Sequence, residues 1–220
     1  MAFRDRNLPT YSLAEELISA ISHGVGALLS IAGLVVGVVF AVMSEDVYAV
    51  VSMAIFGGTL VLLYTMSTIY HALKKNNAKR VFQVIDHCSI FLLIAGTYTP
   101  FTLVAIRNTA WGWPLFGIVW AAAIVGIVLN AISIEKFKKF SMICYIAMGW
   151  VIVFAIMPLY HSMQLGGIIL VLTGGIFYTV GAVLYGLGKK KKYMHSLWHF
   201  FVLVGSLTHY FAILFYVIIK

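Results

Sequence analysis

The sequence predicts an all-α membrane protein, a bundle of seven transmembrane helices with a cytoplasmic N-terminus and an external C-terminus. Of its 220 residues, 62% are hydrophobic and only 10% are charged, whereas roughly half the residues of a soluble domain are apolar. The hydrophobic residues form seven segments, and each can cross a hydrocarbon core, which takes about 20 residues of helix. No segment alternates apolar and polar residues as the strands of outer-membrane barrels do. Basic residues lie almost entirely on one side of the predicted membrane, which gives the orientation.

The seven helices are expected to form one domain over residues 1–220, joined by loops of only a few residues. We place the helices near residues 17–43, 47–72, 82–106, 111–134, 140–160, 165–188 and 194–219. The first is longer than the core of a signal peptide, so we expect it to stay in the mature protein. Ser12 and Glu15 have the spacing of a capping box, which predicts a helix start near residue 13. Pro100 and Pro158 lie late in the third and fifth helices, where we expect kinks or early ends.

The basic residues indicate topology rather than nucleic-acid binding, although the net charge is +8. Thirteen of the fifteen precede the first helix or lie between helices 2 and 3, 4 and 5, or 6 and 7. These are Arg4, Arg6, Lys74, Lys75, Lys79, Arg80, Lys136, Lys138, Lys139 and Lys189 to Lys192. By the positive-inside rule this side is cytoplasmic. We therefore expect a multi-pass protein of the bacterial inner membrane whose basic stripe contacts anionic lipid headgroups.

Five polar residues are expected to meet inside the cytoplasmic half of the bundle. At about 1.5 Å per helical residue, His71, Asp86, His195 and His199 all lie roughly 5 to 10 Å inside the basic boundary. Residues four apart on a helix share a face, so His195 and His199 can hold one ion, and Ser67 lies on the His71 face. Three imidazoles and one carboxylate can therefore converge.

Three histidines with an open fourth position are typical of a catalytic zinc site, where the metal lowers the pKa of a bound water to about 7. We predict Zn²⁺ ligands at His71, His195 and His199. Asp86 could be a further ligand, an orienting residue or the general base, and Ser67 could hold the water or the developing oxyanion. The HExxH pattern of zinc proteases is absent because serine follows His195, so the base must come from another helix. A proton relay or a structural polar network remains an alternative interpretation of the same residues.

Other polar residues near this cluster are open to two interpretations. Glu16, Ser19 and His23 share one face of the first helix and could either support the metal ligands or cap the bundle. His87 lies about 100° around the helix from Asp86, so we expect it to make a packing or loop contact. His209 lies roughly 21 Å beyond His195, too deep to join the cluster.

Four separated stretches of the sequence, in order, carry a resemblance to a known family. They are EELISAISHGVG, STIYH, IDHCSIFLLIAGTYTPF and MHSLWHFFVLVGSLTH. They resemble the motifs of bacterial hemolysin III proteins, which belong to the progestin and adipoQ receptor group that includes the adiponectin receptors. The resemblance covers the chain from Glu16 to His209.

The resemblance implies a seven-helix bundle with a cytoplasmic N-terminus and a zinc ion held by His71, His195 and His199. In the receptors, residues matching Asp86 and Ser67 lie at the zinc-bound water, and the receptors are associated with ceramidase-like amide hydrolysis. The long N-terminal region of the adiponectin receptors has no counterpart here, so we do not expect hormone signalling.

Three functions are therefore considered. The first is an intramembrane zinc hydrolase of a lipid amide or ester, since a site buried in the inner leaflet favours a lipid substrate. The second, suggested by the family name, is a pore-forming or cytolytic protein, although no polar face repeats along several helices to line a channel. The third is a membrane-homeostasis sensor in which zinc only clamps the second and seventh helices together.

Overall fold

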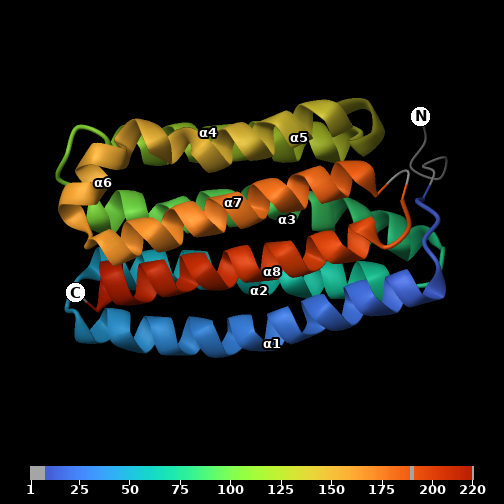
Figure 1. Cartoon of the computed structure of the whole chain (residues 1–220), viewed down its shortest axis with the longest axis horizontal. Coiled ribbons are helices and arrows are strands. Elements are labelled where there is room, and N and C mark those ends of the chain that lie inside the picture. The colour runs from blue at the N-terminus through green and yellow to red at the C-terminus, as the bar shows by residue number, and fades with distance from the viewer. Residues whose placement is uncertain (1–7, 189–190, 220) are drawn as a thin grey trace.

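The computed structural model describes residues 8–188 and 191–219 and confirms an all-α protein with seven membrane-spanning helices, whereas the orientation of its termini stays a prediction. Over these residues it has seven helices long and apolar enough to cross a membrane, and no strand. The elements are α1 (Leu13–Met43), α2 (Val47–Ala72), α3 (Asn77–Pro100), η2 (Phe101–Ala105), α4 (Gly112–Ile132), α5 (Ile134–Trp150), η3 (Val151–Ala155), α6 (Ile156–Ser162), α7 (Leu165–Leu187), α8 (Met194–Ile213) and η4 (Leu214–Ile218). The helices lie side by side along the long axis, and α1 begins at the end of the bundle opposite to that where α8 finishes (Figure 1).

The helix starts follow from polar caps in the sequence. Ser12 caps α1 in the predicted capping box with Glu15. The third and fifth helices begin earlier than expected because the side chains of Asn76 and Ser133 accept backbone N–H groups of the first turns. Lys79 and Lys138, which we expected in loops, consequently lie within α3 and α5.

The expected effects of Pro100 and Pro158 are both present. Proline lacks an N–H donor and so interrupts the helical hydrogen-bond ladder. The π-helix η2 follows directly after Pro100, and the 3₁₀ segment η3 directly precedes α6, the short helix that contains Pro158. Both irregular segments lie away from the predicted metal ligands, which are on regular α-helix.

Small residues let the helices approach closely. On α1, the carbonyl oxygen of Gly33 accepts the Tyr210 hydroxyl at 2.9 Å. A Cβ at Gly37 would lie 2.0 Å from the Met53 side chain. This pair therefore marks a tight interface of α1 with α2 and α8, as its spacing indicates. The α3 helix, which carries Asp86, is the most deeply buried of the seven spans.

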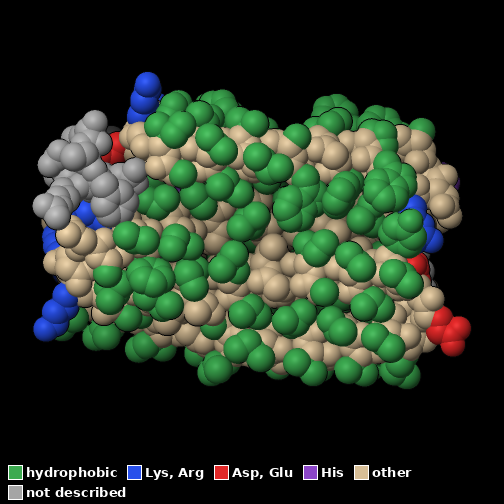
Figure 2. All heavy atoms as spheres, turned by 180° about the vertical axis from the view of Figure 1, so that it is seen from behind, with side chains coloured by type: hydrophobic (Ala, Val, Ile, Leu, Met, Phe, Trp, Pro, Cys, Tyr) green, Lys and Arg blue, Asp and Glu red, His purple; other side chains and the backbone are tan. Residues whose placement is uncertain are grey.

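The surface matches a bilayer. On the face seen in Figure 2, hydrophobic side chains cover the middle of the bundle, and charged side chains lie at the two ends. We call one of these ends the basic end. Its described residues are Lys74, Lys75, Lys79, Arg80, Lys136, Lys138, Lys139, Lys191 and Lys192. Arg4, Arg6, Lys189, Lys190 and Lys220 lie outside the described residues. The chain is a multi-pass membrane protein.

Candidate metal centre and its cavity

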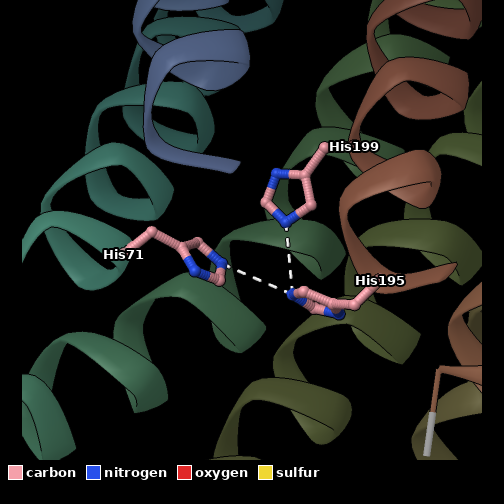
Figure 3. Close-up of side chains that lie close together, drawn as sticks. All are labelled: His71, His195 and His199. Atoms are coloured by element: carbon pink, nitrogen blue, oxygen red, sulfur yellow. Dashed lines mark hydrogen bonds between the residues drawn. The ribbon is translucent and has the colours of Figure 1, made fainter. Parts of the chain in front are cut away.

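The three predicted histidines converge near the basic end of the bundle. The Nε2 atom of His195 lies 3.4 Å from Nε2 of His71 and 3.2 Å from Nε2 of His199. All three side chains are buried, and they point toward one another from α2 and α8 (Figure 3). Among the described residues, these three histidines form the group whose possible ligand atoms all lie within 4.8 Å of one another.

The spacing of two of the three nitrogen pairs, His195 with His71 and His195 with His199, suits a tetrahedral metal. Zinc binds imidazole nitrogen at about 2.0 to 2.1 Å, so two ligands of a tetrahedral site lie about 3.3 Å apart. Neutral imidazole is also a ligand that zinc, copper, iron and nickel accept. The three residues therefore fit a metal ion, and their geometry leaves its identity open.

The tautomer of His71 is also correct for metal binding. Its Nδ1 lies 2.7 Å from Oε2 of Glu16. Because a carboxylate can only accept, Nδ1 carries the proton and Nε2 keeps its lone pair for a metal. The other Glu16 oxygen accepts the Lys79 ammonium at 2.6 Å, and Lys79 also donates to the Leu73 carbonyl at 3.0 Å. The Lys79 side chain is only 2% exposed.

Two more residues of α1 contact the histidine cluster. The ring of His23 lies 3.8 Å from the ring of His199, centre to centre. Both His23 nitrogens and Nδ1 of His199 are buried with no partner among the described residues. Ser19 donates to the Ser196 hydroxyl at 3.2 Å, beside His195. The α1 face that we singled out therefore lies against the ligands, not at a bundle cap.

The segment before α1 also reaches the site. The ring of Tyr11 stacks on His195 with centres 4.6 Å apart and planes at 16°. Burial, together with the nearby Tyr185, Glu16 and Asp86, raises the pKa of the Tyr11 phenol. The phenol therefore stays protonated at physiological pH and packs as a neutral ring.

Asp86 and Ser67 lie near the cluster but are not part of the converging nitrogens. Asp86 is buried, interacts electrostatically with His71 and lies beside Ser67. Its Oδ2 is 3.8 Å from Nδ1 of His87. The Ser67 hydroxyl is fully buried, with no hydrogen-bond partner among the described residues. The Ser67 hydroxyl can therefore still donate one hydrogen bond.

A cavity of about 140 Å³ begins at this site and runs along the bundle. Asp86, His87 and His23 line the end of it near the three converging histidines, which themselves do not line it, and His209 lines it further along the bundle. His209 is thus outside the histidine cluster, as expected, but lines the same cavity. His87 does more than pack, because its Nε2 lies 3.3 Å from the Tyr185 hydroxyl at the cavity wall. Between these residues the lining is largely aliphatic and aromatic.

The sequence interpretation missed three residues of the site, namely Lys79, Tyr11 and Tyr185. We interpret Lys79 from the sequence as one of the basic residues that indicate topology. It also lies seven residues before Asp86 and therefore two turns away on the same helix face. That spacing was a usable signal. Tyr11 and Tyr185 carried none, because aromatic residues near a membrane boundary are usually interfacial.

Comparison with known proteins gives the family of the chain. A family model described as "Haemolysin-III related" matches residues 11–210. "Hemolysin-3" of Bacillus cereus is 43% identical over 209 residues, covering 95% of this chain and 94% of the relative. "Hemolysin-3 homolog" of Bacillus subtilis (strain 168) is 41% identical over 206 residues, covering 94% and 96%.

A more distant similarity connects the chain with an animal protein. The human "Monocyte to macrophage differentiation factor" is 26% identical over 177 residues, covering 78% of this chain and 72% of the relative. The family assignment rests on the match with the family model and on the two bacterial relatives. The chain belongs to the haemolysin-III family.

Proposed function

We propose that this protein is an intramembrane zinc hydrolase that cleaves an amide or ester bond of a lipid in the bacterial inner membrane. The observation that carries the proposal is the convergence of His71, His195 and His199, with possible ligand atoms all within 4.8 Å of one another, beside an apolar cavity lined by Asp86. A structural zinc site is usually closed by a fourth protein ligand, whereas a catalytic site keeps one position open. Three imidazoles with no fourth member among the described residues correspond to the open type.

Each residue around the proposed metal centre has a separate role in the hydrolysis. A bound zinc ion would polarise a carbonyl and supply hydroxide from water at neutral pH. Ser67 donates a hydrogen bond to the carbonyl oxygen as negative charge develops there. Asp86 takes the proton of the attacking water and passes it to the leaving nitrogen or oxygen. A bond forms between the water oxygen and the carbonyl carbon, and the bond to the leaving group breaks.

The cavity supports a lipid as the substrate. Its lining is largely apolar, and several of its lining residues belong to the middle of the membrane-spanning helices α3 and α7. An acyl chain that enters this cavity brings the adjoining carbonyl group toward Asp86 and the three histidines. A ceramide-like amide is one such molecule.

The proposal is tested by metal content and turnover in parallel. Elemental mass spectrometry of the detergent-purified protein should find about one zinc per chain, lost in His71→Ala and His199→Ala. Asp86→Asn should keep the metal and lose about 10²- to 10⁴-fold in hydrolysis of a fluorescent N-acyl lipid, the usual range for a general base. Undiminished hydrolysis by Asp86→Asn would exclude Asp86 as the base, and stable protein that takes up no metal would end the hydrolase proposal.

The names of the bacterial relatives favour a second candidate, a pore-forming or cytolytic protein. This activity would not require the metal centre. Leakage of a dye from liposomes should therefore persist when His71, His195 and His199 are all replaced by alanine. Leakage that is absent from the wild type, or that disappears with the histidines, argues against a pore.

A further inference from the structure

A second, smaller cavity joins the large one near the basic end of the bundle. It has a volume of about 10 Å³, close to the room that one water molecule needs. Tyr185, His87, Tyr145 and Met142 line both cavities, so the two are adjacent. The remaining residues of its wall are Ile134 and three polar residues, Asn130, Ser141 and Lys138, none of which lines the large cavity.

Hydrogen bonds fix the neutral polar groups of this wall. The Ser141 hydroxyl donates to the Asn130 carbonyl oxygen at 2.7 Å, and the Asn130 amide nitrogen donates to the Tyr145 hydroxyl at 3.2 Å. The Tyr145 hydroxyl donates in turn to the backbone carbonyl of His87 at 2.9 Å. The wall is therefore built in advance of any ligand, and these groups already have partners.

Lys138 provides the charge of the small cavity. Among the described residues that line either cavity, it is the only lysine or arginine, and Asp86 is the only acid. Lys138 is half-buried, unlike its neighbours Lys136 and Lys139, which are exposed. Its Nζ lies 4.8 Å from the centre of the Tyr185 ring. A positive charge held partly out of water attracts an anion more strongly than one in free solvent.

The Tyr185 ring connects this charge with the metal centre. Its centre lies 5.7 Å from that of the His195 ring, and its hydroxyl lies 3.3 Å from Nε2 of His87. One aromatic ring therefore touches the cation, the small cavity and a metal ligand. A molecule whose reacting bond lies at the histidines can reach Lys138 with a short headgroup.

We propose that the Lys138 cavity binds the anionic headgroup of the lipid substrate, a carboxylate or a phosphate. One headgroup oxygen occupies the small cavity beside Lys138, and the rest of the headgroup extends toward the basic end. The amide or ester then faces the three histidines, and the acyl chain lies in the large cavity. This substrate class, an acylated anion, rests on the proposed hydrolase function, whereas binding of the anion does not.

Binding of matched lipids to zinc-free protein tests the inference. Zinc is removed with a chelator so that a carboxylate cannot gain affinity by binding the metal. N-oleoylglycine and N-oleoylethanolamine share one acyl chain and one amide, and only the first is anionic. Lysophosphatidic acid and mono-oleoylglycerol form the corresponding phosphate pair. Quenching of tryptophan fluorescence reports binding, since Trp150 and Trp198 line the large cavity.

We expect at least one anionic lipid to bind roughly tenfold more tightly than its neutral partner, as a hydrogen bond to a charged group allows. Lys138→Gln should remove this preference, and Lys139→Gln, the exposed neighbour on α5, should keep it. Lys138→Met, which keeps an aliphatic stem against Tyr185, should behave as Lys138→Gln. The pair that shows the preference identifies the carboxylate or the phosphate as the ligand.

Equal binding within both pairs, or a preference that survives in both Lys138 variants, would overturn the inference. Turnover of the same lipids by the zinc-loaded protein shows whether the headgroup site or the proposed hydrolase function has failed. Hydrolysis without any Lys138-dependent preference would support the hydrolase function and refute the headgroup site. A Lys138-dependent preference without hydrolysis would support the headgroup site and refute the hydrolase function.

Discussion

Glu16 determines which nitrogen of His71 faces the metal centre. Its carboxylate holds the Nδ1 proton at 2.7 Å, and Lys79 holds the carboxylate at 2.6 Å. Such carboxylate–histidine pairs orient the ring and raise its basicity as a ligand. Since Lys79 itself is almost fully buried, the three side chains form one connected unit between α1, α2 and α3.

Glu16→Gln should weaken metal binding without unfolding the bundle. Glutamine keeps the size of the side chain but can bond His71 in either tautomer, and it leaves the Lys79 ammonium without its anion. We expect a 10- to 100-fold loss of zinc affinity, the usual effect of removing an outer partner of a ligand histidine. Competition with a chromophoric chelator measures the affinity. Glu45→Gln, an exposed glutamate at the other end of the bundle, is the control and should bind zinc as the wild type does.

At the residue scale, the sequence predicted the convergence of the three histidines better than the residues that surround them. The positions of His195 and His199 on one helix face follow from their spacing, and their depth follows from the adjacent lysines. The partner of a buried lysine such as Lys79 does not follow, because it depends on where a helix begins and how it rotates against its neighbours. Tyr185 lies at the site because α7 packs on α8. No local pattern in the sequence predicts that packing.

Among the elements, α1 supplies none of the converging nitrogens, yet it contacts all three ligand histidines directly or through a neighbour. Glu16 bonds His71, His23 lies on His199, and Ser19 bonds Ser196 beside His195. Glu15 also accepts the backbone N–H of Tyr193, just before α8, at 2.8 Å. The α1 helix therefore fixes α2 and α8 relative to each other near the metal centre.

Two glycines of α4 allow a clean test of helix packing. A Cβ at Gly126 would lie 2.3 Å from the ring of Phe91, which is fully buried, whereas a Cβ at Gly117 would meet nothing within 4 Å. Gly126→Ala should therefore lose about 1 to 3 kcal/mol of unfolding free energy, typical of overpacking. Gly117→Ala should be neutral or gain up to about 1 kcal/mol from helix propensity. Thermal unfolding in detergent measures both, and equal melting temperatures would refute the close contact of α3 with α4.

At the element scale, apolar runs predicted that seven helices exist, and caps decided where they begin. The start of α1 was found because Ser12 and Glu15 form a recognisable pair. The starts of α3 and α5 were placed too late because their first turns are polar, and hydrophobicity alone cannot distinguish a polar helical turn from a loop.

For the whole molecule, the metal should act as a cross-link between α2 and α8. A ligand that binds only the folded state stabilises it by about 2.7 kcal/mol when present at 100 times its dissociation constant. Removal of zinc by a chelator should therefore lower the melting temperature of the wild type, and zinc addition should restore it. His71→Ala should show neither effect. A melting temperature that is independent of zinc in the wild type would contradict a metal site at these histidines.

The orientation of the whole bundle is a prediction from its charge distribution. The described lysines and Arg80 gather at the basic end, which the positive-inside rule assigns to the cytoplasm. Alkaline phosphatase, which needs the oxidising periplasm for its disulfides, should be active when fused after residue 220. The same enzyme fused after Lys75, in the loop between α2 and α3, should be inactive. The opposite pattern would reverse the topology.

The separation of the ligands along the chain has a consequence for biosynthesis. His71 and His195 are 124 residues apart, and the second and third ligands lie on the last transmembrane helix. A nascent chain with six helices inserted holds a single ligand imidazole and has no metal centre. Loading of the proposed metal would therefore be the final step of maturation, and the proposed hydrolase activity would arise only after the whole chain has been synthesised.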